Sequence, residues 1–326
     1  MGQTIAAKAA PTISNPAMKI VPRARDGVGA SCVSLPVGAW PTTLDFLVTR
    51  FPAISRSEWT NRMLRSDITD KDGEPVTPET RFTPHQKIFY YRSVANEPRI
   101  PFDETVIYQD EFIVVADKPH FLPVVPAGRF VQETLLVRLK RKLGIDTLAP
   151  AHRIDRDTAG LVLFIIQPKT RAAYHRLFSD RLIEKRYEAI AGFSAEISFP
   201  VTRRSRFSEG AAFMQMQEVP GVPNAETHIA LLAQHGGLAS YALRPVSGQK
   251  HQLRVHMAAL GIPIVNDRLY PQLLAEDDAD CCDQFERPLQ LLAKEIAFID
   301  PLSGQARLFT SRRRLADCET DVSAGN

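Results

Sequence analysis

Residues 151–164 read AHRIDRDTAGLVLF and place five titratable side chains directly before an apolar segment. In an extended segment side chains alternate between two faces, so Arg153 and Asp155 would share one space while Ile154 points into the core. A neighbouring arginine keeps a carboxylate ionised when water is partly excluded, and an ionised, half-buried carboxylate is a plausible nucleophile. On composition alone, a structural ion pair at the entrance to a strand is the more common interpretation.

The bulk composition is that of an ordinary globular protein, with 326 residues, 44% hydrophobic side chains and a formal net charge of +3. This length suggests about two domains. The longest apolar run, near Leu161, is far too short to cross a bilayer, and the N-terminus lacks the apolar segment of a secreted protein. We therefore expect a cytoplasmic protein. The four cysteines have no zinc-binding spacing, so reduced thiols and no metal site are expected.

The chain divides by pattern into two predicted domains, residues 39–95 and 102–314, between disordered tails at residues 1–38 and 315–326. The first domain has helical spacing over residues 42–51 and a capping-box signature at Ser55 that opens a second helix. An Asp-Gly turn and a strand follow, which makes a small α+β domain. Three arginines of this domain are predicted to contact RNA: Arg56, Arg62 and Arg65.

The second domain is richer in strands than in helices. Helices are expected over residues 134–143, 168–178 and 249–260. Strands are expected at residues 106–108, 112–116, 161–166, 185–191, 211–217, 226–233, 241–244, 289–299 and 307–309. Neither a P-loop nor the glycine fingerprint of a dinucleotide site is present.

Five segments resemble the motifs of the RluA-type RNA pseudouridine synthases, in the same order along the chain. They are His152–Leu161 (HRLDxxTSGL in the family), Val106–Pro119, Lys185–Ala189, Gly248–His256 (GRTHQIRVH) and Gly261–Tyr270 (GhPIvGDxLY). Residues 41–92 also resemble, more weakly, an S4 RNA-binding domain. The family resemblance implies an α+β fold: a mostly antiparallel mixed β-sheet catalytic domain with flanking helices, and here a small S4-like domain before it.

The resemblance assigns a role to each residue of a catalytic centre. Asp155 matches the nucleophile, and Arg254 would pair with it and hold its charge. Tyr187 would stack on the target uracil and bring a hydroxyl near C5. Isomerising uridine to pseudouridine needs neither redox chemistry nor group transfer. We therefore expect no cofactor, and in particular no nucleotide cofactor.

The resemblance also implies that the partner is a structured RNA, and rRNA is favoured over tRNA. We expect the enzyme to be a monomer. The target nucleotide must leave the RNA stack to reach Asp155. Arg153 is the candidate to fill the vacated space, and Lys250 and His251 would share one helix face with Arg254. Gln249 and Lys250 stand where the family has Arg-Thr, which could alter RNA contacts beside the site.

Two other functions fit parts of the pattern. A non-catalytic RNA-binding or ribosome-assembly factor could use the same fold without chemistry. A carboxylate-based hydrolase would need a second acid at a defined separation, for which Asp157 is the nearby candidate.

Overall fold

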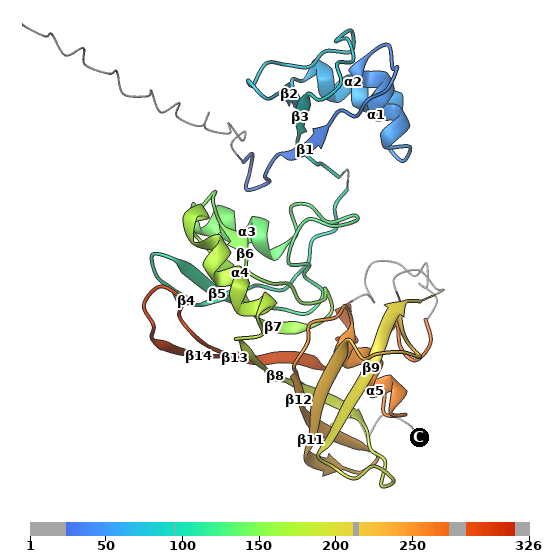
Figure 1. Cartoon of the computed structure of the whole chain (residues 1–326), viewed down its shortest axis with the longest axis vertical. Helices are drawn as coiled ribbons and strands as arrows, with labels where there is room; N and C mark the ends of the chain where they lie inside the picture. Colours follow the sequence, from blue (N-terminus) through green and yellow to red (C-terminus); the bar gives the residue numbers. More distant parts are fainter. Residues whose placement is uncertain (1–23, 95, 211–214, 274–284, 317–326) are drawn as a thin grey trace, which may run out of the picture. The chain divides into compact units, whose positions relative to one another are not determined.

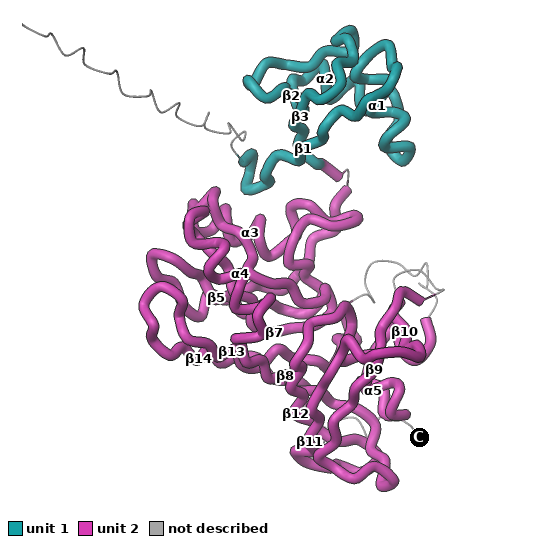
Figure 2. The backbone as a smooth tube through the Cα atoms, viewed as in Figure 1, with its two compact units in different colours: residues 1–92 teal, residues 93–326 magenta. Residues whose placement is uncertain are grey.

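The computed structural model describes residues 24–94, 96–210, 215–273 and 285–316. The chain forms two compact units, residues 1–92 (unit 1) and residues 93–326 (unit 2), shown in separate colours in Figure 2. No helix in the described ranges combines the length and the apolar composition that a membrane crossing requires.

Unit 1 packs two helices beside a small antiparallel sheet with strand order β1-β3-β2. Its elements are β1 (Ser31–Ser34), α1 (Thr43–Arg50), α2 (Arg56–Leu64), β2 (Ile68–Asp70) and β3 (Lys87–Tyr90). Both predicted helices are present. Thr42 and Asp45 form a reciprocal capping box at the start of α1, and the Ser55 hydroxyl accepts from the Glu58 backbone N–H at the start of α2.

Strand β1 lies inside the segment that the sequence predicts to be a disordered tail, so this prediction is wrong for Ser31–Ser34. The strand pairs along its whole length with β3, and Leu35 directly after it is buried in the core of unit 1. Only four residues with a weakly apolar pattern form the strand, which is too little for a period-two signal. Residues 1–23 and 317–326, which make up most of the predicted tails, lie outside the described residues.

Unit 2 is built on one large sheet with the strand path β10-β9-β11-β12-β8-β13-β7-β5-β4, from which β14 and β6 branch at β13 and β7 (Figure 1). Its strands are β4 (Thr105–Gln109), β5 (Ile113–Lys118), β6 (Ala149–Pro150), β7 (Ala159–Ile165), β8 (Glu184–Gly192), β9 (Val201–Glu209), β10 (Met216–Val219), β11 (Ala225–His235), β12 (Leu238–Pro245), β13 (Leu291–Ile299) and β14 (Ala306–Thr310). Its helices are α3 (Leu135–Leu143), a 3-10 turn (Pro168–Thr170) continued by α4 (Arg171–Ser179), and α5 (Gln252–Ala259).

The pairing confirms the predicted fold class. Every strand pair described in unit 2 is antiparallel except β7 with β13, which run parallel. The sheet is therefore mixed and mostly antiparallel, and helices flank it as expected for an α+β protein.

Helices cover both faces of the sheet around β7. Along this strand Leu161, Leu163 and Ile165 pack in one cluster with α4, whereas Val162 and Phe164 pack in another with α3. This is the alternation that a strand imposes on its side chains, and it explains why the segment reads as a continuous apolar run. The strand is thereby fixed on both faces, and so is the polar segment that precedes it.

Strand β9 is another element that the sequence fails to predict. It carries the basic run Arg203–Arg206, which resembles a solvated surface segment. In the folded chain Arg203 pairs with Glu218 of β10 and Arg204 with Glu226 of β11, so neighbouring strands neutralise these charges. Of the strand predicted at residues 211–217, the first four residues lie outside the described ranges.

Gly160 permits the parallel contact between β7 and β13. Its φ is +110°, and a Cβ added to it would lie 2.3 Å from the Ala293 carbonyl oxygen and 2.7 Å from the Ala293 nitrogen. Both atoms belong to backbone in the middle of the sheet, so a side chain at this position would push the two strands apart.

We predict that Gly160→Ala lowers the free energy of unfolding of unit 2 by more than about 3 kcal/mol, because it combines a backbone clash with an unfavourable φ. The matched control is Gly144→Ala, since Gly144 also has a positive φ of +68° but has no atom within 4 Å of the position that a Cβ would take. The control should cost only about 1–2 kcal/mol. Urea unfolding followed by far-UV circular dichroism measures both, and equal losses would contradict the clash. Tryptophan fluorescence is unsuitable because Trp40 and Trp59 both lie in unit 1.

Candidate active site

The polar segment before β7 is tied to β5 through its backbone. Lys118, at the end of β5, is fully buried and donates to the carbonyl oxygens of Arg156 at 2.8 Å and Pro119 at 3.0 Å. Burial lowers the pKa of Lys118 to about 7, although the charges of Asp157 and Asp155 oppose the shift. His120 contacts the Asp157 carbonyl oxygen through Nδ1 at 2.7 Å. These contacts fix the conformation of the segment without using its side chains.

His152 ties the other end of the same segment to β7. Its Nε2 accepts from the backbone N–H of Leu163 at 3.1 Å, and its ring stacks on Phe178 with centroids 4.7 Å apart. An N–H can only donate, so Nε2 carries no proton. Burial lowers the pKa of His152 to about 3, which keeps the ring neutral. His152 and His120 therefore have structural, hydrogen-bonding roles.

Arg254 occupies the centre of the site. Its side chain is 2% exposed and forms a two-pronged pair with Asp267, with Nε–Oδ2 at 2.8 Å and Nη2–Oδ1 at 2.6 Å. Burial alone would lower the pKa of Arg254, but the hydrogen bonds and charge of Asp267, together with Asp155 and Asp157, raise it overall. The guanidinium also lies over the Tyr270 ring, 5.5 Å from its centroid.

Asp155 faces the remaining nitrogen of this guanidinium. Its Oδ2 lies 3.4 Å from Arg254 Nη1, and its Oδ1 lies 3.9 Å from His251 Nε2. The carboxylate is 28% exposed, so it is held from the protein side and open toward solvent. Ile154 beside it packs into the core cluster of α3, as the alternation predicts. The arrangement presents an ionised carboxylate at the protein surface with a fixed cation behind it.

Strand register brings Tyr187 to the same place. Tyr187 of β8 lies opposite Ala293 of β13, which in turn lies opposite Gly160 at the start of β7. The strand with Tyr187 and the strand that follows Asp155 are thus separated by a single strand. Burial, and then the charge of Asp155, raise the pKa of Tyr187, so its hydroxyl stays protonated at neutral pH.

Helix α5 is shorter than predicted at its start. The sequence predicts a helix from residue 249, but α5 begins at Gln252, because His251 has a left-handed φ of +55° and acts as its N-cap. Lys250 therefore does not share a helix face with Arg254, and this prediction is wrong. Lys250 is exposed, whereas His251 is 8% exposed and faces inward to Asp155 and Tyr270.

The remaining residues predicted to contact RNA differ in exposure. Arg153 is exposed beside Asp155. In unit 1, Arg56 and Arg65 keep exposed side chains and pair with Asp45 and Asp67, respectively. Arg62 is only 6% exposed; its Nε donates to Glu58 at 2.7 Å and its guanidinium lies over Trp59. Arg62 therefore packs inside unit 1 and is not exposed for the RNA contact that the sequence predicts.

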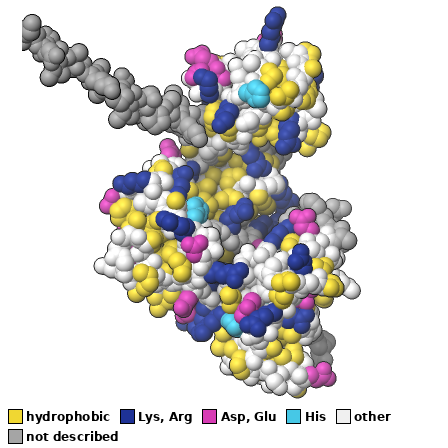
Figure 3. All heavy atoms as spheres, viewed as in Figure 1, with side chains coloured by type: hydrophobic (Ala, Val, Ile, Leu, Met, Phe, Trp, Pro, Cys, Tyr) yellow, Lys and Arg dark blue, Asp and Glu magenta, His cyan; other side chains and the backbone are white. Residues whose placement is uncertain are grey.

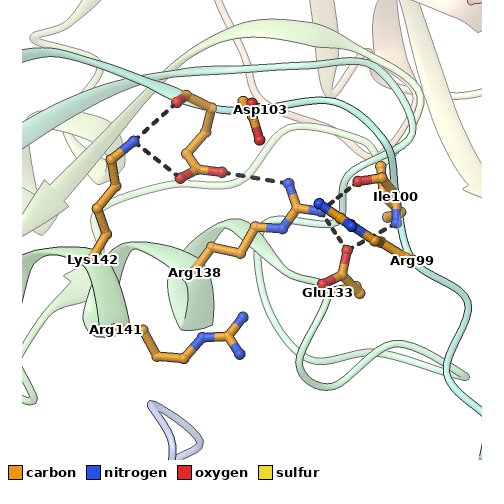
Figure 4. A pocket seen from close by; sticks show the side chains of 8 residues that line it. Arg99, Ile100, Asp103, Glu133, Arg138, Arg141 and Lys142 are labelled. Atoms are coloured by element: carbon orange, nitrogen blue, oxygen red, sulfur yellow. Dashed lines mark hydrogen bonds and ion pairs between the residues drawn. The ribbon is translucent and has the colours of Figure 1, made fainter.

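The basic run at the end of α3 also has a structural explanation. A hollow of about 400 Å³ lies between this helix and the segment before β4, and Arg138 spans it (Figure 4). Arg138 donates to the carbonyl oxygens of Ile100 and Phe102 and pairs with Glu133 and Glu104. Lys142 also pairs with Glu104, so these two cations are neutralised by neighbouring acids, and the hollow holds none of the residues around Asp155.

Asp267 and Tyr270 are the two site residues for which the sequence predicts no role. Asp267 accepts the Leu269 and Tyr270 backbone N–H groups as well as Arg254, at 2.9 and 3.1 Å for the two backbone bonds. The one available signal is their place in the segment Gly261–Tyr270, which resembles a family motif.

Comparison with known proteins agrees with this geometry. Residues 112–259 match the family model described as RNA pseudouridylate synthase. An uncharacterised RNA pseudouridine synthase of Synechocystis is 30% identical over 70% of this chain and 78% of the relative. The dual-specificity RNA pseudouridine synthase RluA of Haemophilus ducreyi is 31% identical over 66% of this chain and 95% of the relative. This chain belongs to the RluA-type RNA pseudouridine synthases.

The fold of this pseudouridine synthase is likewise shared. A structure of human RNA pseudouridylate synthase domain containing 1 superposes with a TM-score of 0.53 at 20% identity, over 67% of this chain and 86% of that one. About a third of this pseudouridine synthase has no counterpart in the Haemophilus relative, since the alignment covers 66% of the chain.

We predict that protonation of His152 destabilises the enzyme at low pH. Its pKa of about 3 in the folded state lies below the ordinary value of 6.5, so between these values the unfolded chain binds a proton that the folded chain excludes. His152→Gln keeps a hydrogen-bond acceptor for Leu163 but does not titrate. From pH 6 to pH 4, the free energy of unfolding of the wild type should fall relative to this variant by roughly 1.4 kcal/mol per pH unit. A difference that stays constant with pH would contradict this interpretation.

Proposed function

We propose that this pseudouridine synthase isomerises specific uridines in structured RNA, with Asp155 as the nucleophile. The observation that carries the proposal is the Asp155 carboxylate, which is open to solvent on one side and faces the buried Arg254 guanidinium at 3.4 Å on the other. A cation that is itself fixed by Asp267 holds the carboxylate in one position.

The reaction breaks the C1′–N1 bond of uridine and joins C1′ to C5 of the same base. C5 loses a proton and N1 gains one, so the atoms balance without any second reactant. Asp155 attacks the nucleoside, and Arg254 stabilises its charge. Tyr187 offers its ring for stacking on uracil, and its protonated hydroxyl can donate a hydrogen bond.

The substrate must present one nucleotide outside its stack. Arg153 is exposed two residues before Asp155 and is the proposed residue that occupies the vacated space. Lysine and arginine side chains are spread over the face of unit 2 in Figure 3, among acidic ones, and such cations contact phosphates with little sequence preference. Lys250, exposed just before α5, is proposed as one of these contacts.

Unit 1 is proposed to be an S4-like RNA-binding domain. The target RNA is proposed to be rRNA rather than tRNA, and the enzyme is proposed to act as a monomer. The support is the pair of short helices packed beside a small sheet, with exposed Arg56 and Arg65 at the two ends of α2. These two arginines pair with acids whose side chains are partly exposed, and exposed pairs are weak enough to exchange for phosphate.

We predict that Asp155→Asn abolishes pseudouridine formation, with a loss of at least about 10³-fold, because nucleophile substitutions generally cost that much or more. The amide keeps the size of the side chain but cannot attack. Release of tritium from RNA labelled at uridine C5 measures the reaction. Asp146→Asn, an exposed position of the same unit, serves as the control and should keep wild-type activity.

The same assay separates the alternatives. A non-catalytic RNA-binding or ribosome-assembly factor would bind RNA and release no tritium in either protein. A hydrolase would liberate free uracil, which chromatography detects, and would depend on Asp157 as its second acid. Full activity of Asp155→Asn would refute the proposed nucleophile.

We further predict that the double variant Arg56→Gln/Arg65→Gln weakens RNA binding by about tenfold and reduces its salt dependence, since each lost phosphate contact removes one released counterion. Lys71→Gln/Lys87→Gln removes the same charge from other exposed positions of unit 1. Filter binding at several salt concentrations measures both. An equal loss in the two variants would mean that only net charge matters.

A further inference from the structure

A chain of hydrogen bonds behind Asp155 has a defined direction. His251 faces Asp155 Oδ1 through Nε2 at 3.9 Å, and its Nδ1 lies 3.0 Å from the Tyr270 hydroxyl. The backbone N–H of Met216, the first residue of β10, donates to the same hydroxyl oxygen at 2.7 Å. Three groups therefore follow one another from β10 to the nucleophile.

One arrangement of protons gives every donor in this chain an acceptor. Met216 donates to the phenol oxygen, so the single phenol proton is free to be donated onward. Among the described residues its acceptor is His251 Nδ1. A neutral imidazole that accepts at Nδ1 carries its own proton on Nε2, and this is the nitrogen that faces Asp155.

The surroundings keep the ring neutral. Burial lowers the pKa of His251 below its ordinary value, and the charges of Arg254 and Lys250 act in the same direction. Asp155 and Asp267 oppose this shift without reversing it. The ring thus reaches the carboxylate as a neutral N–H donor and not as a second cation.

We propose that Tyr270 and the Met216 backbone fix His251 as its Nε2–H tautomer, so that His251 and Arg254 position the two oxygens of Asp155 from two sides. The proposal rests on Asp155 being the reacting group. The separation of 3.9 Å exceeds a hydrogen bond, and catalytic contacts often shorten only when substrate is bound. His251 is thereby a positioning residue instead of the RNA contact that the sequence predicts.

Nuclear magnetic resonance of ¹⁵N-histidine-labelled enzyme tests the tautomer directly. The chain has eight histidines, and the signal of His251 is identified by its absence in His251→Gln. We expect the Nε2–H form at neutral pH. We also expect the pKa of His251 to rise in Tyr270→Phe, because a donor that opposes protonation of Nδ1 is removed.

The opposite proton arrangement predicts the opposite sign. If Nδ1–H donated to the phenol, Tyr270→Phe would remove an acceptor that stabilises the imidazolium, and the pKa would fall. A fall, or an Nδ1–H tautomer in the wild type, overturns the proposal. Phenylalanine retains the ring under Arg254, so the effect is confined to the hydroxyl. Tyr241→Phe is the control: its hydroxyl donates to the Gly192 carbonyl oxygen, and its loss should leave His251 unchanged.

Kinetics test the positioning role. His251→Ala should lower kcat by roughly 10- to 100-fold, the cost of misplacing a reacting group by about 1 Å, with KM changed less than about threefold. His251→Gln, whose amide N–H can still reach Asp155, should recover much of the loss. A raised KM with unchanged kcat would make His251 an RNA contact and refute the positioning role. If Asp155→Asn proved active, the proposed function would fail while the resonance experiment would still report the tautomer.

Discussion

The buried guanidinium of Arg254 is the group on which the site depends. A charge removed from water needs partners of opposite sign and a hydrogen-bond acceptor for each N–H. Asp267 satisfies two nitrogens of the guanidinium and is itself held by backbone N–H groups of the turn that follows. One nitrogen is left to face Asp155. The position of the Asp155 carboxylate thus derives from an ion pair between α5 and the turn after it, elements far from Asp155 in sequence.

The opposing half of the site is fixed by backbone and not by charge. The segment that carries Asp155 is bound at its carbonyl groups by Lys118 and His120, and at its start by His152. Their side chains do not need to touch a substrate to matter, because they leave the segment with one conformation. The position of Asp155 is therefore supported by residues that contribute ordinary hydrogen bonds.

The sequence predicts the site better than the elements around it. Asp155 lies 3.4 Å from Arg254, and Tyr187 lies on the strand two places from β7; each of the three belongs to a motif whose order along the chain is distinctive, and their catalytic roles stay predictions. The start of α5 is not predictable from periodicity, since the left-handed conformation of His251 depends on contacts with Tyr270 and Asp155. Asn266 illustrates the opposite case: it replaces a family glycine and keeps the positive φ, +61°, that asparagine tolerates.

Charge patterns proved the least informative feature. Arg62 is predicted to contact RNA, yet it is buried beside Glu58 and Trp59. In the basic run of β9, Arg203 and Arg204 pair with acids that strand register places beside them, while Arg204 itself stays exposed.

The parallel pairing of β13 with β7 has a consequence for biosynthesis. A growing chain that ends at residue 260 already contains Asp155, Tyr187 and Arg254, but it lacks Asp267 and the strand between β7 and β8. Sheets with such distant pairings form slowly, and only after the last partner has been made. This arrangement of Asp155, Tyr187 and Arg254 can therefore assemble only once translation has passed Ile299, so an incomplete chain emerging from a ribosome holds the three residues without holding them together.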